Sequence, residues 1–307
     1  MRGRKLGMLF GGEKIIKKIV QDALTFAKEN EFLLIFGAVV GGCSKGVQYP
    51  DSDYDTRFLY LDKKTSRIFY PMQEKEDTLK HRKYFDEAVS PYEWIPLWEA
   101  TSFFQLLNTP GFDGKISLGL YNTVGWTLQS PYTWDPYGLT AKLMPFVNSI
   151  FRKEYYIPYH AELIRTYWTS DDKIVYKDYI YAIYEALCVL YADKYNVFPP
   201  VYMKTLAASL LEEELTTDIF SLIHEAQEYS EKFCRSGQSK KMHDSHFQGT
   251  IAKNPKYDEI ITKALMKSEH IEGTDITIER INQQINRIYR VMEESVYHEQ
   301  KVYRAMD

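Results

Sequence analysis

The order of hydrophobic and polar residues predicts a helix near the start of the chain. Between residues 13 and 29, apolar side chains recur every three or four positions, and lysines occupy the opposite side. The apolar positions are Ile16, Ile19, Val20, Ala23 and Ala27. Because this spacing gives one apolar stripe along the helix, we expect the helix to pack against a sheet.

Two apolar runs follow the helix and predict neighbouring strands. Residues 32–40 (FLLIFGAVV) form an uninterrupted run of the length typical of a buried strand. Gly41 and Gly42 come directly after it and predict a turn, because glycine accepts unusual backbone angles and lets backbone N–H groups approach a phosphate. A second strand is predicted to open at Asp53-Tyr54-Asp55 and to continue over residues 56–61.

Two aspartates lie at the start of this second strand. Asp53 and Asp55 flank Tyr54, and successive side chains of an extended chain point to opposite faces. The two carboxylates therefore share one face while Tyr54 points away. Like charges this close repel each other unless a cation lies between them. Oxygen ligands at this spacing suit Mg²⁺, which keeps waters and substrate phosphates in its other positions.

Helices dominate the chain beyond about residue 140. Polar composition predicts loops over 63–83 and 237–254. The segment 115–128 is weakly helical, and Gly119 and Gly125 predict interruptions in it. Further helices are predicted over 99–107, 178–193 (ending near Asn196), 206–233 and 278–292. These patterns predict an α+β chain with two domains, a sheet-containing domain over 1–140 and a mainly helical domain over 141–307.

Composition narrows the functional classes. The chain has 307 residues, 45% of them apolar and 26% charged, which is typical of a globular protein. Its net charge of −4 gives no support for broad nucleic-acid binding. Three widely spaced cysteines favour a reducing compartment over a disulfide framework. No apolar run has transmembrane length, so we expect a cytoplasmic protein without a membrane partner.

The residues around the two aspartates resemble a known superfamily. Gly41-Gly42, ten residues and then Asp53-Tyr54-Asp55 are similar to the signature of the nucleotidyltransferases that include DNA polymerase β. The closer match is to the RlaP-like branch, which is linked to RNA repair. It is carried by Gly46, Pro50, Asp51, Ser52, Asp53, Tyr54 and Asp55, with Arg57 and Tyr60 after them. That branch usually has Gly-Ser at the turn, where this chain has Gly41-Gly42, so the departure bears on nucleotide contacts.

The resemblance implies a fold and an activity. It implies a small mixed β-sheet nucleotidyltransferase domain with helices on it, followed by a mainly helical C-terminal domain. The implied reaction is Mg²⁺-dependent transfer of a nucleoside monophosphate from a nucleoside triphosphate such as ATP to a hydroxyl acceptor, with pyrophosphate release. Two Mg²⁺ ions, or Mn²⁺ in their place, would bind Asp53, Asp55 and a third acid. Gly41, Gly42, Ser44 and Ser52 would contact the phosphates. The acceptor could be an RNA end, a protein or a small molecule.

A third acid is required by this mechanism, and the chain offers alternatives. Glu93 lies in a strand-like apolar run, residues 92–95, just before the predicted helix 99–107. The family places an acid on a strand before a similar helix, so Glu93 is our first choice and Asp86 the second. In another alignment residues 122–126 form the strand that carries the acid. Asn122 would then replace it, and catalysis would be in doubt.

The second domain adds one candidate, and two other functions stay open. Lys177 begins the predicted helix 178–193 and matches the position from which related enzymes reach the triphosphate. A solvated lysine at a helix start is an equal alternative. The chain could instead be a catalytically silent nucleotide-binding regulator or an antitoxin-like interaction protein of the same fold. Its oligomeric state is left open.

Overall fold

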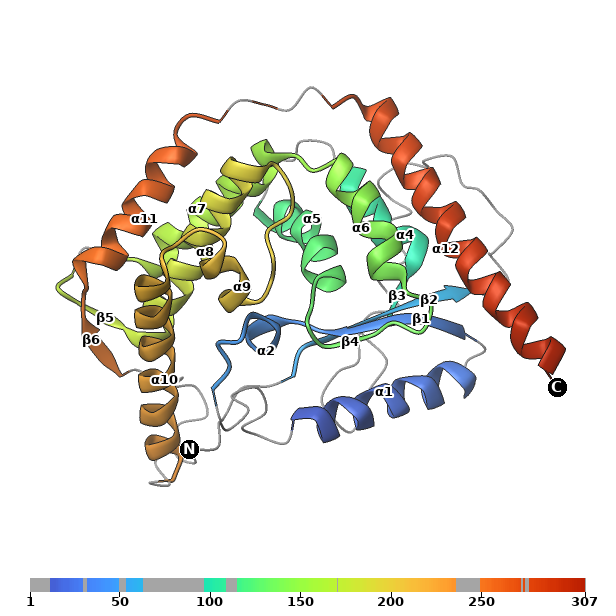
Figure 1. The fold of residues 1–307 in the computed structure, drawn as a ribbon, viewed down its shortest axis with the longest axis horizontal. Coiled ribbons are helices and arrows are strands. Elements are labelled where there is room, and N and C mark those ends of the chain that lie inside the picture. The colour runs from blue at the N-terminus through green and yellow to red at the C-terminus, as the bar shows by residue number, and fades with distance from the viewer. Residues whose placement is uncertain are drawn as a thin grey trace.

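The computed structural model describes residues 12–29, 32–49, 54–62, 97–108, 115–169, 171–235, 249–271, 273 and 276–306. The protein has an α+β fold in which helices surround a small mixed sheet (Figure 1), as predicted at this level. None of the helices in the described ranges combines the length and apolar character needed to span a membrane.

The sheet has four strands in the order β3-β2-β1-β4. Strand β1 (Phe32–Val39) pairs antiparallel with β2 (Thr56–Asp62) and with β4 (Thr133–Trp134). Strand β3 (Leu97–Glu99) lies parallel to β2 and makes the sheet mixed. Strands β1 and β2 confirm the strands predicted over 32–40 and 56–61. Their runs of apolar residues were long enough to identify them from the sequence.

The two faces of the sheet pack against different parts of the protein (Figure 1). Helix α1 (Gly12–Glu29), predicted over 13–29, covers one face, where Ile19 and Ala23 pack with Phe58 and Tyr60. Leu59 and Leu61, two residues apart on β2, belong to the main core on the other face. Successive side chains of a strand point to opposite faces. Asp55 lies four residues before Leu59, so both are on the face of the main core.

The residues after β1 form a short helix where the sequence predicted only a turn. Helix α2 spans Gly41–Lys45 and ends at Gly46. Both Gly41 and Gly46 have positive φ angles, of 69° and 77°, which side chains with a Cβ rarely adopt. A Cβ on Gly46 would also overlap the ring of Tyr202. The glycines therefore bound one helical turn, and the prediction of an open turn was incomplete.

Helices α4 to α7 follow β3. They are α4 (Ala100–Gln105) with a 3₁₀ turn over Leu106–Asn108, α5 (Lys115–Leu128), α6 (Leu139–Ser149) and α7 (Lys153–Tyr167). The first confirms the helix predicted over 99–107. The predicted interruption of 115–128 is wrong, because α5 is continuous. A Cβ on Gly125 would overlap the ring of Phe198, so this glycine makes room for an aromatic side chain and does not end the helix.

The remaining chain is helical with one small pair of strands. Its helices are α8 (Tyr176–Tyr195), α9 (Met203–Ala208), α10 (Glu213–Arg235), α11 (Pro255–Ser268) and α12 (Ile278–Met306). They confirm the helices predicted over 178–193, 206–233 and 278–292. Strands β5 (Lys173–Val175) and β6 (Thr250–Ala252) pair antiparallel. Sequence analysis placed β6 in a loop, because a three-residue strand is too short to show a period.

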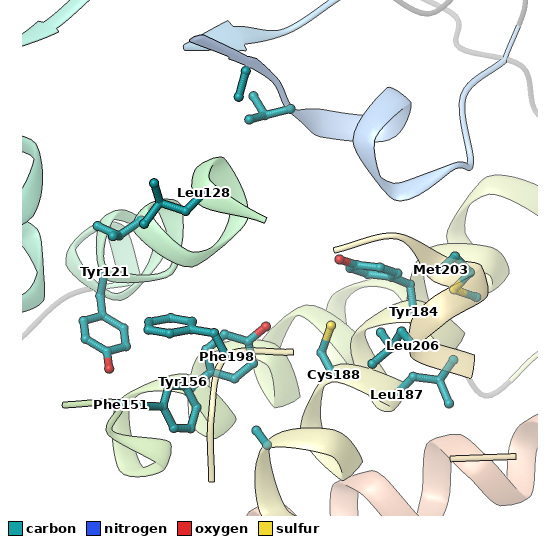
Figure 2. Packing of buried hydrophobic residues seen from close by; sticks show 14 of the residues in the cluster. Tyr121, Leu128, Phe151, Tyr156, Tyr184, Leu187, Cys188, Phe198, Met203 and Leu206 are labelled. Atoms are coloured by element: carbon teal, nitrogen blue, oxygen red, sulfur yellow. The ribbon is translucent and has the colours of Figure 1, made fainter. Parts of the chain in front are cut away.

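One cluster of buried side chains connects the sheet with the helices. It includes Ile35 and Leu59 from the sheet and Leu187 from α8, and Figure 2 shows the part around Tyr156 and Phe198. Helix α12 returns to α4, where the Tyr289 hydroxyl donates to the Thr101 carbonyl over 2.8 Å. The core is therefore continuous across residue 140, and the predicted division into two domains stays a prediction.

Candidate functional site

Gly41 and Asp55 are in direct contact where β1 ends and β2 begins. The backbone N–H of Val40 donates to the Asp55 carbonyl over 2.8 Å, which aligns the ends of β1 and β2. A Cβ on Gly41 would overlap Oδ2 of Asp55. The Asp55 carboxylate therefore lies against the backbone at the start of α2, and it is exposed to solvent. The predicted phosphate-binding turn and one predicted metal ligand are thus adjacent.

The predicted orientation of the second strand is confirmed for Tyr54 and Asp55. Tyr54 packs with the small cluster beside α1, whereas Asp55 faces Gly41 on the opposite side. Arg57 shares the face of Asp55. Burial lowers the pKa of Arg57 below its ordinary value, and the carboxylate of Asp55 partly offsets this effect. The carboxylate of Asp55 therefore interacts with the guanidinium group of Arg57 and remains accessible to a second cation.

Several predicted site residues lie outside the described residues: Ser52, Asp53, Asp86 and Glu93. Their convergence with Asp55 stays a prediction. Oxygen ligands suit Mg²⁺, and the exposed carboxylate of Asp55 fits such an ion. Glu99, the acid within β3, is engaged elsewhere. Its carboxylate accepts from the Ser102 N–H over 2.8 Å and so caps α4.

The alternative alignment of the third acid required a strand over residues 122–126. The structure places these residues inside α5, and Asn122 is fully buried. Its Nδ2 lies 3.4 Å from Nε2 of His160. A strand at this position is therefore not formed, and Asn122 points into the helical core. The position of Asn122 gives the alternative alignment no support.

Ser44 and Gly42 face different neighbours. The Ser44 hydroxyl donates to the Gly41 carbonyl over 2.9 Å, and the residue is 1% exposed, so this hydroxyl stabilises α2 itself. Its contact with a phosphate stays a prediction. A Cβ on Gly42 would lie 3.2 Å from the hydroxyl oxygen of Tyr181. Tyr181 on α8 therefore lies close to the α2 backbone, and a side chain at residue 42 would press against its hydroxyl.

Helix α8 connects Lys177 with this part of the site. Lys177 is half-buried in the first turn of α8, and Tyr181 follows four residues later on the same side of the helix. Since Tyr181 lies beside Gly42, α8 presents Lys177 one turn away from the residue that contacts α2. The sequence contained the spacing of this pair, but only the fold shows that Tyr181 lies beside Gly42.

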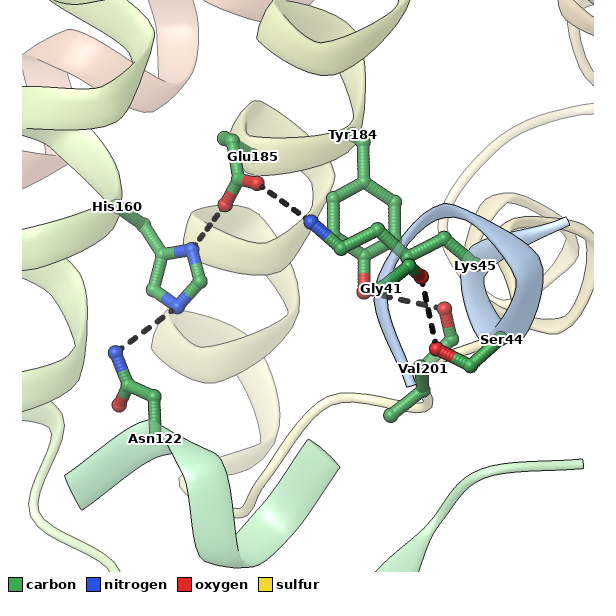
Figure 3. Close-up of polar contacts among 8 residues, drawn as sticks. All are labelled: Gly41, Ser44, Lys45, Asn122, His160, Tyr184, Glu185 and Val201. Carbon is green, nitrogen blue, oxygen red and sulfur yellow. Dashed lines mark hydrogen bonds and ion pairs between the residues drawn. The ribbon is translucent and has the colours of Figure 1, made fainter. Parts of the chain in front are cut away.

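Lys45, the last residue of α2, is held by a carboxylate and three aromatic rings. Figure 3 shows Lys45 with Glu185 and with one of these rings, that of Tyr184. Its Nζ lies 3.2 Å from Oε1 of Glu185. It also lies 4.3, 4.9 and 5.6 Å from the ring centroids of Tyr184, Tyr181 and Trp126. Burial alone would lower the pKa of Lys45, but Glu185 raises this pKa above its ordinary value. Lys45 is therefore a partly buried cation.

Glu185 continues into a buried hydrogen-bonded chain. Its Oε2 accepts from Nδ1 of His160, and Nε2 of His160 faces Asn122 (Figure 3). Burial alone would raise the pKa of Glu185, but Lys45 and His160 hold this pKa below its ordinary value. Burial lowers the pKa of His160, and Glu185 only partly offsets this. Glu185 is therefore anionic and His160 neutral at neutral pH. We name these four residues the Lys45 network.

His160, Glu185 and Cys188 also bring one potential metal ligand each within 4.8 Å of one another. Burial, reinforced by Glu185, raises the pKa of Cys188 well above its ordinary value, so its sulfur is a neutral thiol. A thiol must lose its proton to bind a metal ion, and Lys45 already balances the charge of Glu185. These contacts fit a hydrogen-bonded ion pair better than a metal centre.

Sequence analysis missed Tyr181 and three members of the Lys45 network. One signal was available for Glu185, which is a single carboxylate among the apolar positions Ile183, Ala186 and Leu187 of a predicted helix. A buried acid requires a partner. Nothing in the sequence identified Lys45 or His160 as these partners, because they belong to other elements.

Comparison with family models, with curated proteins and with solved structures finds no match to this chain. The family and the activity implied by the motif therefore remain proposals. Their support comes from the residues themselves and from the geometry of Gly41, Asp55 and α8.

Proposed function

We propose that this protein is a Mg²⁺-dependent nucleotidyltransferase of the polymerase β-like superfamily, in the RlaP-like branch. It would transfer a nucleoside monophosphate from a nucleoside triphosphate to a hydroxyl acceptor, with an RNA end as one candidate acceptor. The observation that carries the proposal is the contact between the exposed carboxylate of Asp55 and the backbone of Gly41. This contact brings the two halves of the sequence motif together.

The order of elements supports the nucleotidyltransferase fold for the sheet region. Strand β1 leads into α2 with Gly41 and Gly42, and β2 begins directly after Asp55. The mixed sheet agrees with the fold that the motif implies. Helix α8 brings Tyr181 to Gly42, with Lys177 one turn away, and so offers groups that could contact a triphosphate.

Each residue would have a defined role in the transfer. Asp55, with Asp53 and Glu93, would hold two Mg²⁺ ions. When bound, such ions neutralise charge on the phosphates and lower the pKa of the attacking hydroxyl. Gly42 lacks a side chain, so its backbone and the neighbouring hydroxyl of Tyr181 could both contact a phosphate. Lys177 would add positive charge near the triphosphate, because positioning and charge neutralisation carry most of the catalysis in phosphoryl transfer.

The proposal is tested with the purified protein, Mg²⁺ and each labelled nucleoside triphosphate. Total RNA, the protein itself and small hydroxyl compounds serve as acceptors. We expect label in one acceptor and release of pyrophosphate. Asp55→Asn should abolish both signals, whereas Asp171→Asn, which removes an exposed carboxylate elsewhere, should not. The second variant controls for a general effect of charge removal.

Two other results would contradict the proposal. Calorimetry that shows triphosphate binding without pyrophosphate release would favour a catalytically silent regulator. No nucleotide binding, together with one partner protein that co-purifies in a fixed ratio, would favour an antitoxin-like interaction protein. Both results would leave the fold as described and change the role of Asp55.

A further inference from the structure

Helix α2 requires tertiary contacts to keep its position. It contains five residues, and a helix of this length is not stable in isolation. Its first residue contacts Asp55, and its last residue, Lys45, extends to α8. Since Gly41 and Lys45 are only four residues apart, a displacement of Lys45 would move the backbone that faces Asp55.

The ion pair with Glu185 is the polar contact that holds Lys45. The side chain of Lys45 is 13% exposed and that of Glu185 is 1% exposed, so water competes little for this pair. Glu185 is itself oriented by His160 on α7, and His160 faces Asn122 on α5. Three helices thus determine the position of one carboxylate, which in turn determines the position of the Lys45 ammonium.

A gain in stability does not by itself explain this arrangement. Burying two charges has a large desolvation cost, and apolar residues of similar volume often stabilise a protein equally well or better. An ion pair differs from an apolar contact in being directional, because the ammonium group must point at the carboxylate. The aromatic rings of Tyr181 and Tyr184 restrict the direction further, since the cation lies over both.

We propose that Glu185 is a positioning residue for the nucleotide site. Through Lys45 it fixes α2, and with α2 the contact between Gly41 and Asp55, in the geometry that receives the phosphates. This inference rests on the proposed function for its effect on nucleotide binding. Its structural part, the fixing of α2, does not depend on that function.

The decisive variant removes both charges at once. Lys45→Met or Glu185→Gln alone leaves one buried charge without its partner, so each should lower the melting temperature. The double variant Lys45→Met/Glu185→Gln leaves no such charge and keeps an oxygen that accepts from Nδ1 of His160, so it should regain most of the loss. If Glu185 positions α2, the double variant should still show a KM for the triphosphate that is raised ~10-fold or more, with kcat changed less.

Leu187→Ala provides a matched control on the same helix. Leu187 is fully buried in α8 and lies outside the Lys45 network, so its truncation creates a cavity and lowers the melting temperature. We expect its KM to stay near the wild-type value. A KM raised equally in this control would overturn the inference, because any loss of core packing would then have the same effect.

Hydrogen–deuterium exchange gives a second readout that needs no substrate. The amides of Gly46 and Val47 donate to the α2 carbonyls of Cys43 and Gly42 over 3.1 and 3.0 Å, and they should exchange faster in Glu185→Gln and in the double variant than in wild type. In Leu187→Ala they should exchange no faster than in wild type. Equal exchange of α2 in wild type and the double variant would show that the ion pair does not fix this helix, and the inference would be wrong.

The two readouts separate failure of the inference from failure of the proposed function. If wild type neither binds nor consumes any triphosphate, the proposed function is wrong, and exchange of α2 alone decides whether Glu185 positions this helix. If wild type is active and the double variant has faster exchange with an unchanged KM, the positioning role is overturned. Faster exchange together with a raised KM supports it.

Discussion

Nζ of Lys45 lies 3.2 Å from Oε1 of Glu185, a residue 140 positions further along the chain. Lys45 ends the short helix that follows β1, and Glu185 lies within α8, so one ion pair joins the sheet region to the helices. Burial disfavours the charged form of both residues, but each residue stabilises the charged form of the other. The same α2 carries Gly41, which contacts Asp55.

Asp55→Asn should abolish nucleotidyl transfer without unfolding the protein. The carboxylate is exposed and lies near Arg57, so we expect the free energy of unfolding to change by less than ~1 kcal/mol. Asp53→Asn should behave alike, because repulsion between the two carboxylates is relieved in either variant. Pyrophosphate release and thermal unfolding measure the two effects. Activity within ~10-fold of wild type, or ~1.4 kcal/mol, would contradict the metal-site interpretation.

Gly41→Ala should damage the site more than the same change at Gly138. Both glycines have positive φ, 69° and 63°, so both alanines carry backbone strain of ~1–3 kcal/mol. The Cβ at residue 41 also overlaps Asp55, whereas the Cβ at residue 138 meets no atom within 4 Å. We expect both variants to unfold at lower temperature and only Gly41→Ala to lose turnover. Equal turnover in the two would mean that the position of Asp55 is not critical.

Gly42→Val should weaken triphosphate binding severely. Even a Cβ at this position lies 3.2 Å from the hydroxyl of Tyr181, and a branched side chain would fill the space beside the α2 backbone. Calorimetric titration measures the affinity. Gly42→Ala adds a single carbon and should have a smaller effect. Unchanged affinity in Gly42→Val would place the phosphates elsewhere and leave Gly42 as a structural corner.

Glu93→Gln tests the third acid. A metal-binding carboxylate replaced by an amide loses its charge, so the Mg²⁺ requirement should shift to higher concentration. Turnover should fall by ~10²-fold, about 3 kcal/mol of barrier. Asp86→Asn serves as the comparison, because Asp86 is the second choice for this role. If only Asp86→Asn loses activity in the Mg²⁺ titration, the assignment of Glu93 is wrong.

Asn122→Asp tests the other alignment. If Asn122 replaced the family's acid, restoring a carboxylate there should raise activity. In the structure the new charge would be buried beside His160, so we expect a loss of stability of ~1–3 kcal/mol and no gain in turnover. Denaturant titration and pyrophosphate release measure both quantities. A rise in turnover would restore the alignment that the helical position of Asn122 leaves unsupported.

Stability should decrease in acid through His160. Its pKa in the folded protein lies below the ordinary value of 6.5, so the unfolded chain binds a proton first. The free energy of unfolding therefore falls as pH decreases from 6.5 towards the folded pKa, by up to ~1.4 kcal/mol per pH unit. Glu185 loses its contribution only below 4.5, as pH falls through its lowered pKa. Lys45 loses its contribution only above 10.5, as pH rises through its raised pKa.

The variant His160→Gln should remove this part of the pH dependence. Denaturant titrations at stepped pH values compare it with wild type and with His224→Gln, which changes an exposed histidine on α10. We expect a shallower decrease only in His160→Gln. Parallel curves for all three proteins would mean that His160 titrates alike in the folded and unfolded chains.

The amino-acid sequence by itself determined the elements whose signal is local. The apolar stripe of 13–29, the apolar runs of 32–40 and 56–61 and the spacing of 178–193 each identify an element within one segment. The orientation of Tyr54 and Asp55 also followed from the period of a strand. Such features depend only on near neighbours in the chain, so they are visible without knowing what packs where.

Only the tertiary structure decided how these elements meet. Gly125 predicted an interruption, but the ring of Phe198, 73 positions later, occupies the space that its missing side chain leaves inside a continuous helix. The short strands β5 and β6 form through pairing with each other and have no period of their own. Lys45 and Glu185 come into contact because α2 packs on α8. Burial strengthens the contact of Phe198 with Gly125 and that of Lys45 with Glu185. Burial depends on the whole fold, because a segment alone cannot exclude water from its side chains.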